Sequence, residues 1–248
     1  MHYLARFVVL FLVVVVWQVP AFSAEKIIKL ATLNWEPYAS EHLEDYGFAS
    51  VIVSKVFEKA GYRVEVSFLP WVRVLEGVKR GEYDAMYPAY YSDERAKVYA
   101  LSKPIAEGPL VFCTRCDAHI QYTSLKDLEP YSIGLVRGYI NTKELDEAHF
   151  LKKQYVNSDK QNLLKVLTGR VDLAVIDRYV AGQIIKSSIP EAAEKLCFLE
   201  PSLEKKPLYV GFSKLVNDYP QLLADFNRTL KEMIADGSIQ KILKDYDL

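Results

Sequence analysis

The sequence predicts an α/β fold made of two similar lobes. A helical segment that ends in Gly81-Glu82-Tyr83-Asp84 and leads into an apolar strand recurs later, ending in Gly169-Arg170-Val171-Asp172. Gly at a helix C-terminus tolerates the left-handed backbone conformation, and an apolar strand suits the interior of a parallel sheet. Helical and strand spacing of apolar residues also alternate along the chain, as in βα units. Together these features indicate two Rossmann-like lobes, with a ligand between them at the carboxyl ends of the strands.

Residues 1–24 have the pattern of a secretory signal peptide. Arg6 precedes an apolar run from Phe7 to Trp17, and small residues follow up to Ala24. The run is shorter than the about 20 residues that a membrane span needs. We therefore expect cleavage near residue 24 and export to the periplasm, with a membrane anchor as the alternative.

The composition excludes some classes of partner. The chain has 31 basic and 32 acidic residues among 248, a formal net charge of −1. Binding of nucleic acid would need a strongly basic face, which this balance does not provide. No Gly/Ser/Pro linker or repeat array divides the chain. We expect one compact unit, a monomer, that binds no nucleic acid.

The first half of the chain alternates strands with helices. Apolar spacing predicts strands at 27–33, 64–68 and 85–87, and helices at 48–60 and 71–78 between them. Gly61 is expected to end the first of these helices. Ser92 is the expected N-cap of a short helix that contains Arg95.

The alternation of strands and helices continues after a predicted strand at 110–112. We expect further strands at 132–136, 171–176 and 196–199, with helices from Thr142 onward and at 163–167. The chain should end in a helix, because Leu222, Leu223, Phe226, Leu230 and Met233 recur at helical spacing before Gly237.

The order of elements and short motifs resembles family 3 of the extracellular solute-binding proteins, the periplasmic receptors of polar amino acid ABC importers. The motifs span essentially the whole chain after residue 24: Pro37-Tyr38, Gly81-Glu82-Tyr83-Asp84, Ser92-Asp93-Glu94-Arg95, Leu101-Ser102-Lys103-Pro104, Gly134 with Arg137-Gly138, Gly169-Arg170-Val171-Asp172 through Asp177, and Ala235-Asp236-Gly237-Ser238. The resemblance implies two lobes joined by two hinge crossings, near 106–109 and 201–206, as in type II periplasmic binding proteins. Lobe 1 would then comprise residues 25–107 and 207–248, and lobe 2 residues 108–206.

The resemblance also implies a site that matches the two charges of an amino acid. Arg95 would take the ligand carboxylate with its planar fork of donors, and Asp177 would take the α-ammonium. Trp35 and Trp71 would enclose the ligand side chain with their flat rings. The alternatives are an Arg95 paired with neighbouring surface acids, an Asp177 that only caps the helix from Arg178, and tryptophans that only pack in the core.

Two departures from the family pattern concern the ligand. Tyr90 stands where the family usually has Ser or Thr, and Tyr139-Ile140 follow Gly138 where it usually has Ser/Thr-Thr. We expect these four residues to line the ligand site. Backbone N–H groups there can still reach an anion, but the usual hydroxyls are replaced. The ligand is then either an unusual amino acid or a carboxylate that lacks part of the α-amino acid frame.

The three cysteines predict a local disulfide. Cys113 and Cys116 follow a strand rather than opening a helix, which argues against a thioredoxin-like motif. The four histidines supply no second pair of ligands for a zinc site, so no metal is expected. In an oxidising compartment we expect a Cys113–Cys116 disulfide, with Cys197 free and buried in the strand 196–199.

The expected function is binding. The sequence has no nucleophile elbow, P-loop, Gly-x-Gly-x-x-Gly or HExxH motif, so we expect neither an enzyme nor a cofactor. By resemblance the protein would close over a small polar ligand, an amino acid or related carboxylate, and deliver it to an ABC permease. The alternatives are a sensory input protein for a receptor, and a cyclohexadienyl dehydratase-like enzyme with Glu36 or Glu107 as general acid.

Overall fold

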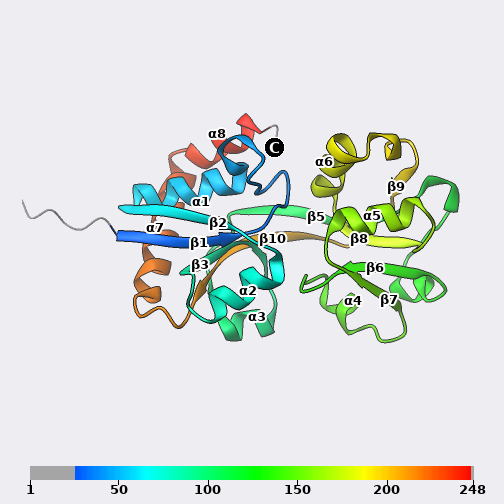
Figure 1. Ribbon diagram of the computed structural model, residues 1–248, viewed down its shortest axis with the longest axis horizontal. Coiled ribbons are helices and arrows are strands. Elements are labelled where there is room, and N and C mark those ends of the chain that lie inside the picture. Colours follow the sequence, from blue (N-terminus) through cyan, green and yellow to red (C-terminus); the bar gives the residue numbers. More distant parts are fainter. Residues whose placement is uncertain (1–25, 247–248) are drawn as a thin grey trace, which may run out of the picture.

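The computed structural model describes residues 26–246, which form two halves that share one β-sheet (Figure 1). The strand order is β2-β1-β3-β10-β5-β8-β6-β7, with β4 pairing with β10 and β9 pairing with β5. The long strands β5 (Ala106–Arg115) and β10 (Glu204–Ser213) connect the halves and pair antiparallel along 106–110 and 204–208. One apolar core fills the first half and also includes Val180 from the second half, and two further cores lie in the second half.

The first half surrounds parallel strands with helices on both sides (Figure 1). Its strands are β1 (Lys26–Thr32), β2 (Tyr62–Phe68), β3 (Ala85–Tyr90) and β4 (Tyr99–Leu101). Its helices are α1 (Phe48–Lys59), α2 (Trp71–Lys79), α3 (Asp93–Val98), α7 (Tyr219–Ala235) and α8 (Ser238–Asp245), with a 3-10 turn at Glu44–Tyr46. The long helix α7 packs on α1, where the ring centroids of Phe57 and Phe226 are 4.8 Å apart.

The second half has the same plan with shorter elements. Its strands are β6 (Ser132–Val136), β7 (Lys152–Val156), β8 (Leu173–Asp177) and β9 (Leu196–Phe198). Its helices are α4 (Lys143–Glu147), α5 (Asp159–Leu167) and α6 (Arg178–Ser188), with 3-10 turns at Cys116–Ala118, Leu125–Leu128 and Pro190–Ala192. β6 pairs parallel with β7 and β8.

The repeated segments occupy equivalent places in the two halves. Gly81 and Gly169 end α2 and α5 with positive φ, 75° and 69°, as a glycine stop requires. The aspartate that ends each copy of the segment uses its side chain to accept a backbone N–H from a neighbouring strand. Asp84 accepts the N–H of Lys29 in β1, and Asp172 accepts the N–H of Ser132 in β6. The predicted α/β fold with two crossing strands is therefore confirmed, while the lobe boundaries remain a prediction.

The predicted cysteine pairing is wrong. Cys116 is bonded to Cys197, 81 residues away, and Cys113 is a buried free thiol. Cys113 lies inside β5 with its side chain buried in the core, whereas Cys116 begins the 3-10 turn that follows this strand. β9 pairs with β5, and this pairing places the Cα atoms of Cys197 and Cys116 4.9 Å apart. Cys197 is exposed, not buried as predicted.

The predicted signal peptide, residues 1–24, lies outside the described residues. Between residues 26 and 246, no helix has both the length and the apolar character needed to cross a membrane.

Candidate functional site

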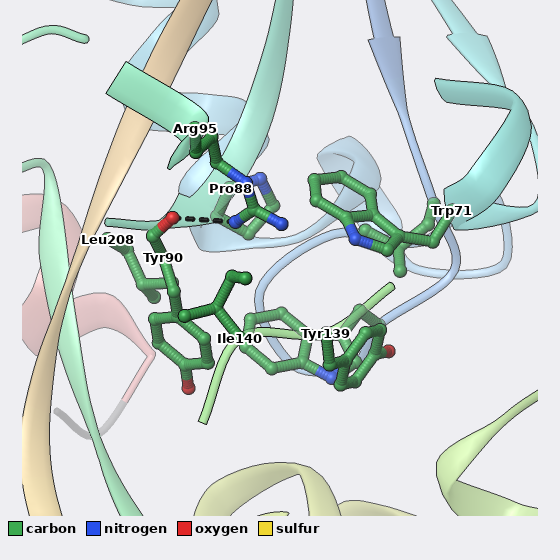
Figure 2. Close-up of a pocket in the computed structure, with 9 residues that line it drawn as sticks. Trp71, Pro88, Tyr90, Arg95, Tyr139, Ile140 and Leu208 are labelled. Atoms are coloured by element: carbon green, nitrogen blue, oxygen red, sulfur yellow. Dashed lines mark hydrogen bonds between the residues drawn. The ribbon is translucent and has the colours of Figure 1, made fainter. Parts of the chain in front are cut away.

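The candidate site lies where the two halves face each other at the carboxyl ends of β1, β3, β6 and β8. Nine residues from both halves line one small cavity (Figure 2): Leu33, Trp35, Trp71, Pro88, Tyr90, Arg95, Tyr139, Ile140 and Leu208. The remaining space is about 20 Å³, room for about one water molecule. Gly138 and Asp177, also expected at the site, do not line the cavity but hydrogen-bond to residues that do.

Arg95 is a buried cation that faces the second half. Ser92 is the N-cap of its helix α3, as the sequence predicted, and the Ser92 hydroxyl accepts the Arg95 N–H at 3.1 Å. The guanidinium donates to the carbonyls of Tyr90 (2.6 Å) and Gly138 (3.2 Å) and lies 5.4 Å from the Trp71 ring (Figure 2). Burial lowers the Arg95 pKa to about 10, so it stays charged at neutral pH. Arg95 is 7% exposed and forms no ion pair within the described residues, which argues against a surface pair.

Asp177, the last residue of β8, uses its two carboxyl oxygens for different tasks. Oδ1 accepts the backbone N–H groups of Tyr179 and Val180, which caps α6. Oδ2 accepts the hydroxyls of Tyr38 (2.9 Å) and Tyr90 (3.0 Å) from the first half. Asp177 is 2% exposed, and burial raises its pKa to about 6. The capping interpretation is thus correct for one oxygen, while the other faces the first half.

The two tryptophans pack in the first core and donate to the second half. Trp35 stacks on Tyr38 with ring centroids 4.6 Å apart, and its Nε1 donates to Asp159 at 3.1 Å. The Nε1 of Trp71 donates to the Gly138 carbonyl at 3.1 Å. Core packing and a place at the site are therefore compatible for both side chains.

Sequence reasoning missed Asp159 at the start of α5. Its Oδ2 accepts Trp35 Nε1 and the Tyr139 hydroxyl, both at 3.1 Å. The carboxyl is 5% exposed, forms no ion pair in the described part of the chain, and burial raises its pKa to about 7. In the sequence it looks like an ordinary first-turn acid after the N-cap Ser158, which does cap α5. No local signal distinguishes it.

Tyr38 and Lys206 were also missed. Tyr38 belongs to a motif that the resemblance used, but its contact with Asp177 joins residues 139 positions apart. Lys206, buried in β10, donates to the Asn141 carbonyl at 2.7 Å and lies 5.2 Å from the Tyr90 ring centroid. It thereby connects a crossing strand to the loop that follows Gly138.

A wider groove of about 600 Å³ lies outside the cavity and is also lined by both halves. It shares Leu33, Trp35, Trp71 and Tyr139 with the cavity and includes Asp159. Glu36 lines this groove and accepts the Ser40 hydroxyl at 2.9 Å, whereas Glu107 is exposed on β5 and lines neither space. Within residues 26–246, no three His, Cys, Asp or Glu side chains are grouped as a metal ion would require.

The whole of this architecture has a counterpart among known proteins. Residues 28–247 match the bacterial extracellular solute-binding proteins, family 3. The chain belongs to this family. It is therefore a family 3 solute-binding protein.

Similar proteins resemble this family 3 protein over most of its length. The arginine-binding extracellular protein ArtP of Bacillus subtilis (strain 168) is 24% identical over 225 residues, 89% of this chain and 85% of ArtP. A histidine kinase sensor domain similar to periplasmic binding proteins superposes with a TM-score of 0.79 at 18% identity, covering 89% and 96% of the two chains. An ancestral arginine-binding protein bound to arginine superposes with a TM-score of 0.76 at 20% sequence identity, covering 89% of this chain and 98% of that chain. The type II periplasmic binding protein fold is confirmed.

We expect this family 3 protein to be more stable at pH 5 than at pH 7.5. Burial holds the pKa of Asp177 at about 6 and that of Asp159 at about 7, above the usual value of about 3.9 for an unfolded chain. The two carboxyl groups therefore bind their protons more tightly in the folded state than in the unfolded chain. The free energy of unfolding is higher at low pH for this reason, and it falls as the pH rises from about 4 to about 7. Urea unfolding across this range measures the slope.

The variant Asp159→Asn checks the origin of that pH dependence. Asparagine keeps an oxygen acceptor for Trp35 and Tyr139 but does not titrate. The free energy of unfolding should then change less steeply between pH 5 and pH 7.5. The matched change Asp117→Asn, at an exposed acid, should leave the slope as it was. An equal slope in wild type and Asp159→Asn would contradict the assignment.

Proposed function

We propose that this protein captures an amino acid, or a closely related small carboxylate, in the cleft and delivers it to an ABC importer. The observation that supports the proposal best is the charge pattern of the facing surfaces. Arg95 contributes a buried cation from the first half, and Asp177 contributes a buried carboxyl from the second half. Neither forms an ion pair within the described residues. A ligand with a carboxylate and an ammonium group would complement both charges.

The proposed mechanism is closure about the two crossing strands. Lobe 1 would be residues 25–107 with 207–248, and lobe 2 residues 108–206, so that only β5 and β10 connect them. Small backbone changes where 106–110 pair with 204–208 would move the lobes as rigid bodies. A ligand favours the closed form by the difference between its affinities for the two forms.

The proposed ligand lies with its carboxylate on Arg95, its ammonium on Asp177 and its side chain near Trp35 and Trp71. Tyr90, Gly138, Tyr139 and Ile140 would set the limits of the space. The arginine-binding name of ArtP supports an amino acid ligand, and Asp159 offers a second buried carboxyl beside the groove. Basic amino acids therefore belong among the first compounds to test.

The proposed setting is the periplasm. The signal peptide would be removed near residue 24, and the monomeric protein would dock on a permease of the inner membrane. Periplasmic extract should then contain the shortened chain. A sensory role would instead leave uptake of the ligand unchanged in cells that lack the protein.

Thermal unfolding with a panel of compounds tests the function. The panel contains the amino acids, their amides and esters, and simple organic acids. A true ligand at 100 times its Kd should stabilise the fold by about 2.7 kcal/mol, which raises Tm by roughly 5–10 °C for a protein of this size. The ligand should be recovered unchanged, as NMR can show. No shift with any amino acid or carboxylate would overturn the proposal, and turnover of prephenate or arogenate would favour the enzyme alternative.

A further inference from the structure

The two halves hydrogen-bond to each other directly across the cleft. Five of these bonds run from donors on the first half to acceptors on the second: Trp35 Nε1 to Asp159, the hydroxyls of Tyr38 and Tyr90 to Asp177, and Trp71 Nε1 and Arg95 Nη2 to the carbonyl of Gly138, all between 2.9 and 3.2 Å. A longer contact of 3.5 Å runs the other way, from Gln183 to Glu36. The first half is thus the donor face and the second half the acceptor face.

These bonds use the same groups that the proposed ligand would use. The Gly138 carbonyl accepts from Arg95 and Trp71, where a ligand carboxylate would accept. The hydroxyls of Tyr38 and Tyr90 donate to Asp177, where a ligand ammonium would donate. The side chains involved are all buried. The buried donors of the first half therefore pair with acceptors of the second half. No third molecule is needed to complete these hydrogen bonds when the halves are closed.

We propose that the five hydrogen bonds form a latch that holds the halves closed without a ligand, so that capture must begin by opening it. The latch residues are Trp35, Tyr38, Trp71, Tyr90 and Arg95 on one side, and Gly138, Asp159 and Asp177 on the other. The apparent affinity for any ligand is then the intrinsic affinity multiplied by the fraction of molecules in which the latch is open. The inference rests on the proposed function only in treating this cleft as the binding site.

The latch also selects the chemistry of the ligand. A zwitterion replaces the hydrogen bonds that its entry breaks. Its carboxylate takes the place of the Gly138 carbonyl as acceptor, and its ammonium takes the place of the Tyr38 and Tyr90 hydroxyls as donor. A plain carboxylate would leave Asp177 without a replacement donor, and a plain amine would leave Arg95 without a replacement acceptor. An unpaired buried polar group is costly, so both should be rejected more strongly than in an open cleft.

Gly108 gives the latch the space that it needs. It lies in the crossing strand β5 opposite Lys206, and a Cβ at this position would overlap both Asp177 Oδ2 and the Tyr38 hydroxyl. The φ angle of Gly108 is not positive, so its backbone does not require glycine. What requires glycine is the close approach of the Asp177 and Tyr38 side chains. Alanine at this position should act as a wedge that leaves every latch side chain intact.

Distances between spin labels test the latch without a ligand. Labels attached through Arg73→Cys on α2 and Lys160→Cys on α5 report on the separation of the halves, since both positions are exposed. The native Cys113 is buried with its pKa raised to about 12, and the other two cysteines are bonded to each other, so the labels go to the new sites. The protein is first unfolded, dialysed and refolded to remove any bound molecule.

The wild-type distance distribution should have one short maximum, and Gly108→Ala should shift it to longer distances. Gly182→Ala is the matched control, because a Cβ there meets nothing within 4 Å, and its distribution should equal that of wild type. The pair Tyr38→Phe with Tyr90→Phe removes two latch bonds without adding volume, and it should also lengthen the distances if Gly108→Ala does not fold. A wild type that already shows the long distances, or a tyrosine pair that keeps the short ones, would overturn the latch. These distances are measured without any compound of the panel. The latch can therefore be disproved while the proposed function stands, and the proposed function can be disproved while the latch stands.

Discussion

Replacing Arg95 with alanine should weaken ligand binding by about 30–1000-fold. The guanidinium is a buried cation that lines the cavity, and a buried charge-assisted hydrogen bond contributes about 1.5–3 kcal/mol. Removing it also strands the ligand carboxylate in a buried place, which brings the expected loss to about 2–4 kcal/mol. Titration calorimetry with the compound that raises Tm measures the change directly.

A second effect of the Arg95 substitution acts in the opposite direction. Arg95→Ala also removes one latch bond, to the Gly138 carbonyl, which favours the open form and thus ligand entry. This gain should be smaller, because Trp71 still donates to the same carbonyl and the other latch bonds remain. Arg73→Ala, an exposed arginine on α2, is the matched control and should bind as wild type does. An Arg95→Ala affinity within threefold of wild type would mean that the ligand carboxylate is held elsewhere.

The parts of the fold that sequence predicted well are those with local signals. The apolar strand β1, the helix α1 and the glycine stops at Gly81 and Gly169 depend on residues that are close together in the chain. Strand β7 gave no such signal, because Lys152–Val156 is mostly polar and exposed. It is a strand because β6 offers it a parallel partner, and strand preference depends strongly on such context.

The site residues also divide into those that the sequence predicted and those that it did not. Their positions in the family pattern were enough to predict a shared place for Trp35, Trp71, Tyr90 and Arg95, which line one cavity. It did not reveal which group bonds to which, because the partners are far apart in the chain, 124 residues for Trp35 and Asp159. The cysteine error has the same cause. The short spacing of Cys113 and Cys116 is a local pattern, whereas the actual bond follows from the pairing of β5 with β9.

The variant Asp177→Asn should distinguish the two classes of ligand that the sequence left open. If the ligand carries an α-ammonium, loss of the carboxylate charge should weaken binding by roughly 30-fold or more, since breaking a buried charge pair costs about 2–5 kcal/mol. If the ligand is a plain carboxylate, the variant should not weaken binding, because nothing cationic then lies against Asp177 and any loss of the latch bonds from Tyr38 and Tyr90 favours the open form. Calorimetry of wild type and variant with the same compound gives the answer.

Asparagine is the informative replacement because it separates charge from helix capping. Its side-chain oxygen can still accept the N–H groups of Tyr179 and Val180, so α6 should keep its N-cap. Asp177→Ala loses the cap as well, which should lower the free energy of unfolding by a further ~0.5–2 kcal/mol. A binding defect that is equal in both variants, with a loss of stability only in Asp177→Ala, would assign the defect to the charge. Normal binding of an α-amino acid by Asp177→Asn would instead direct attention to Asp159, the other buried carboxyl of the cleft, as the partner of the ammonium.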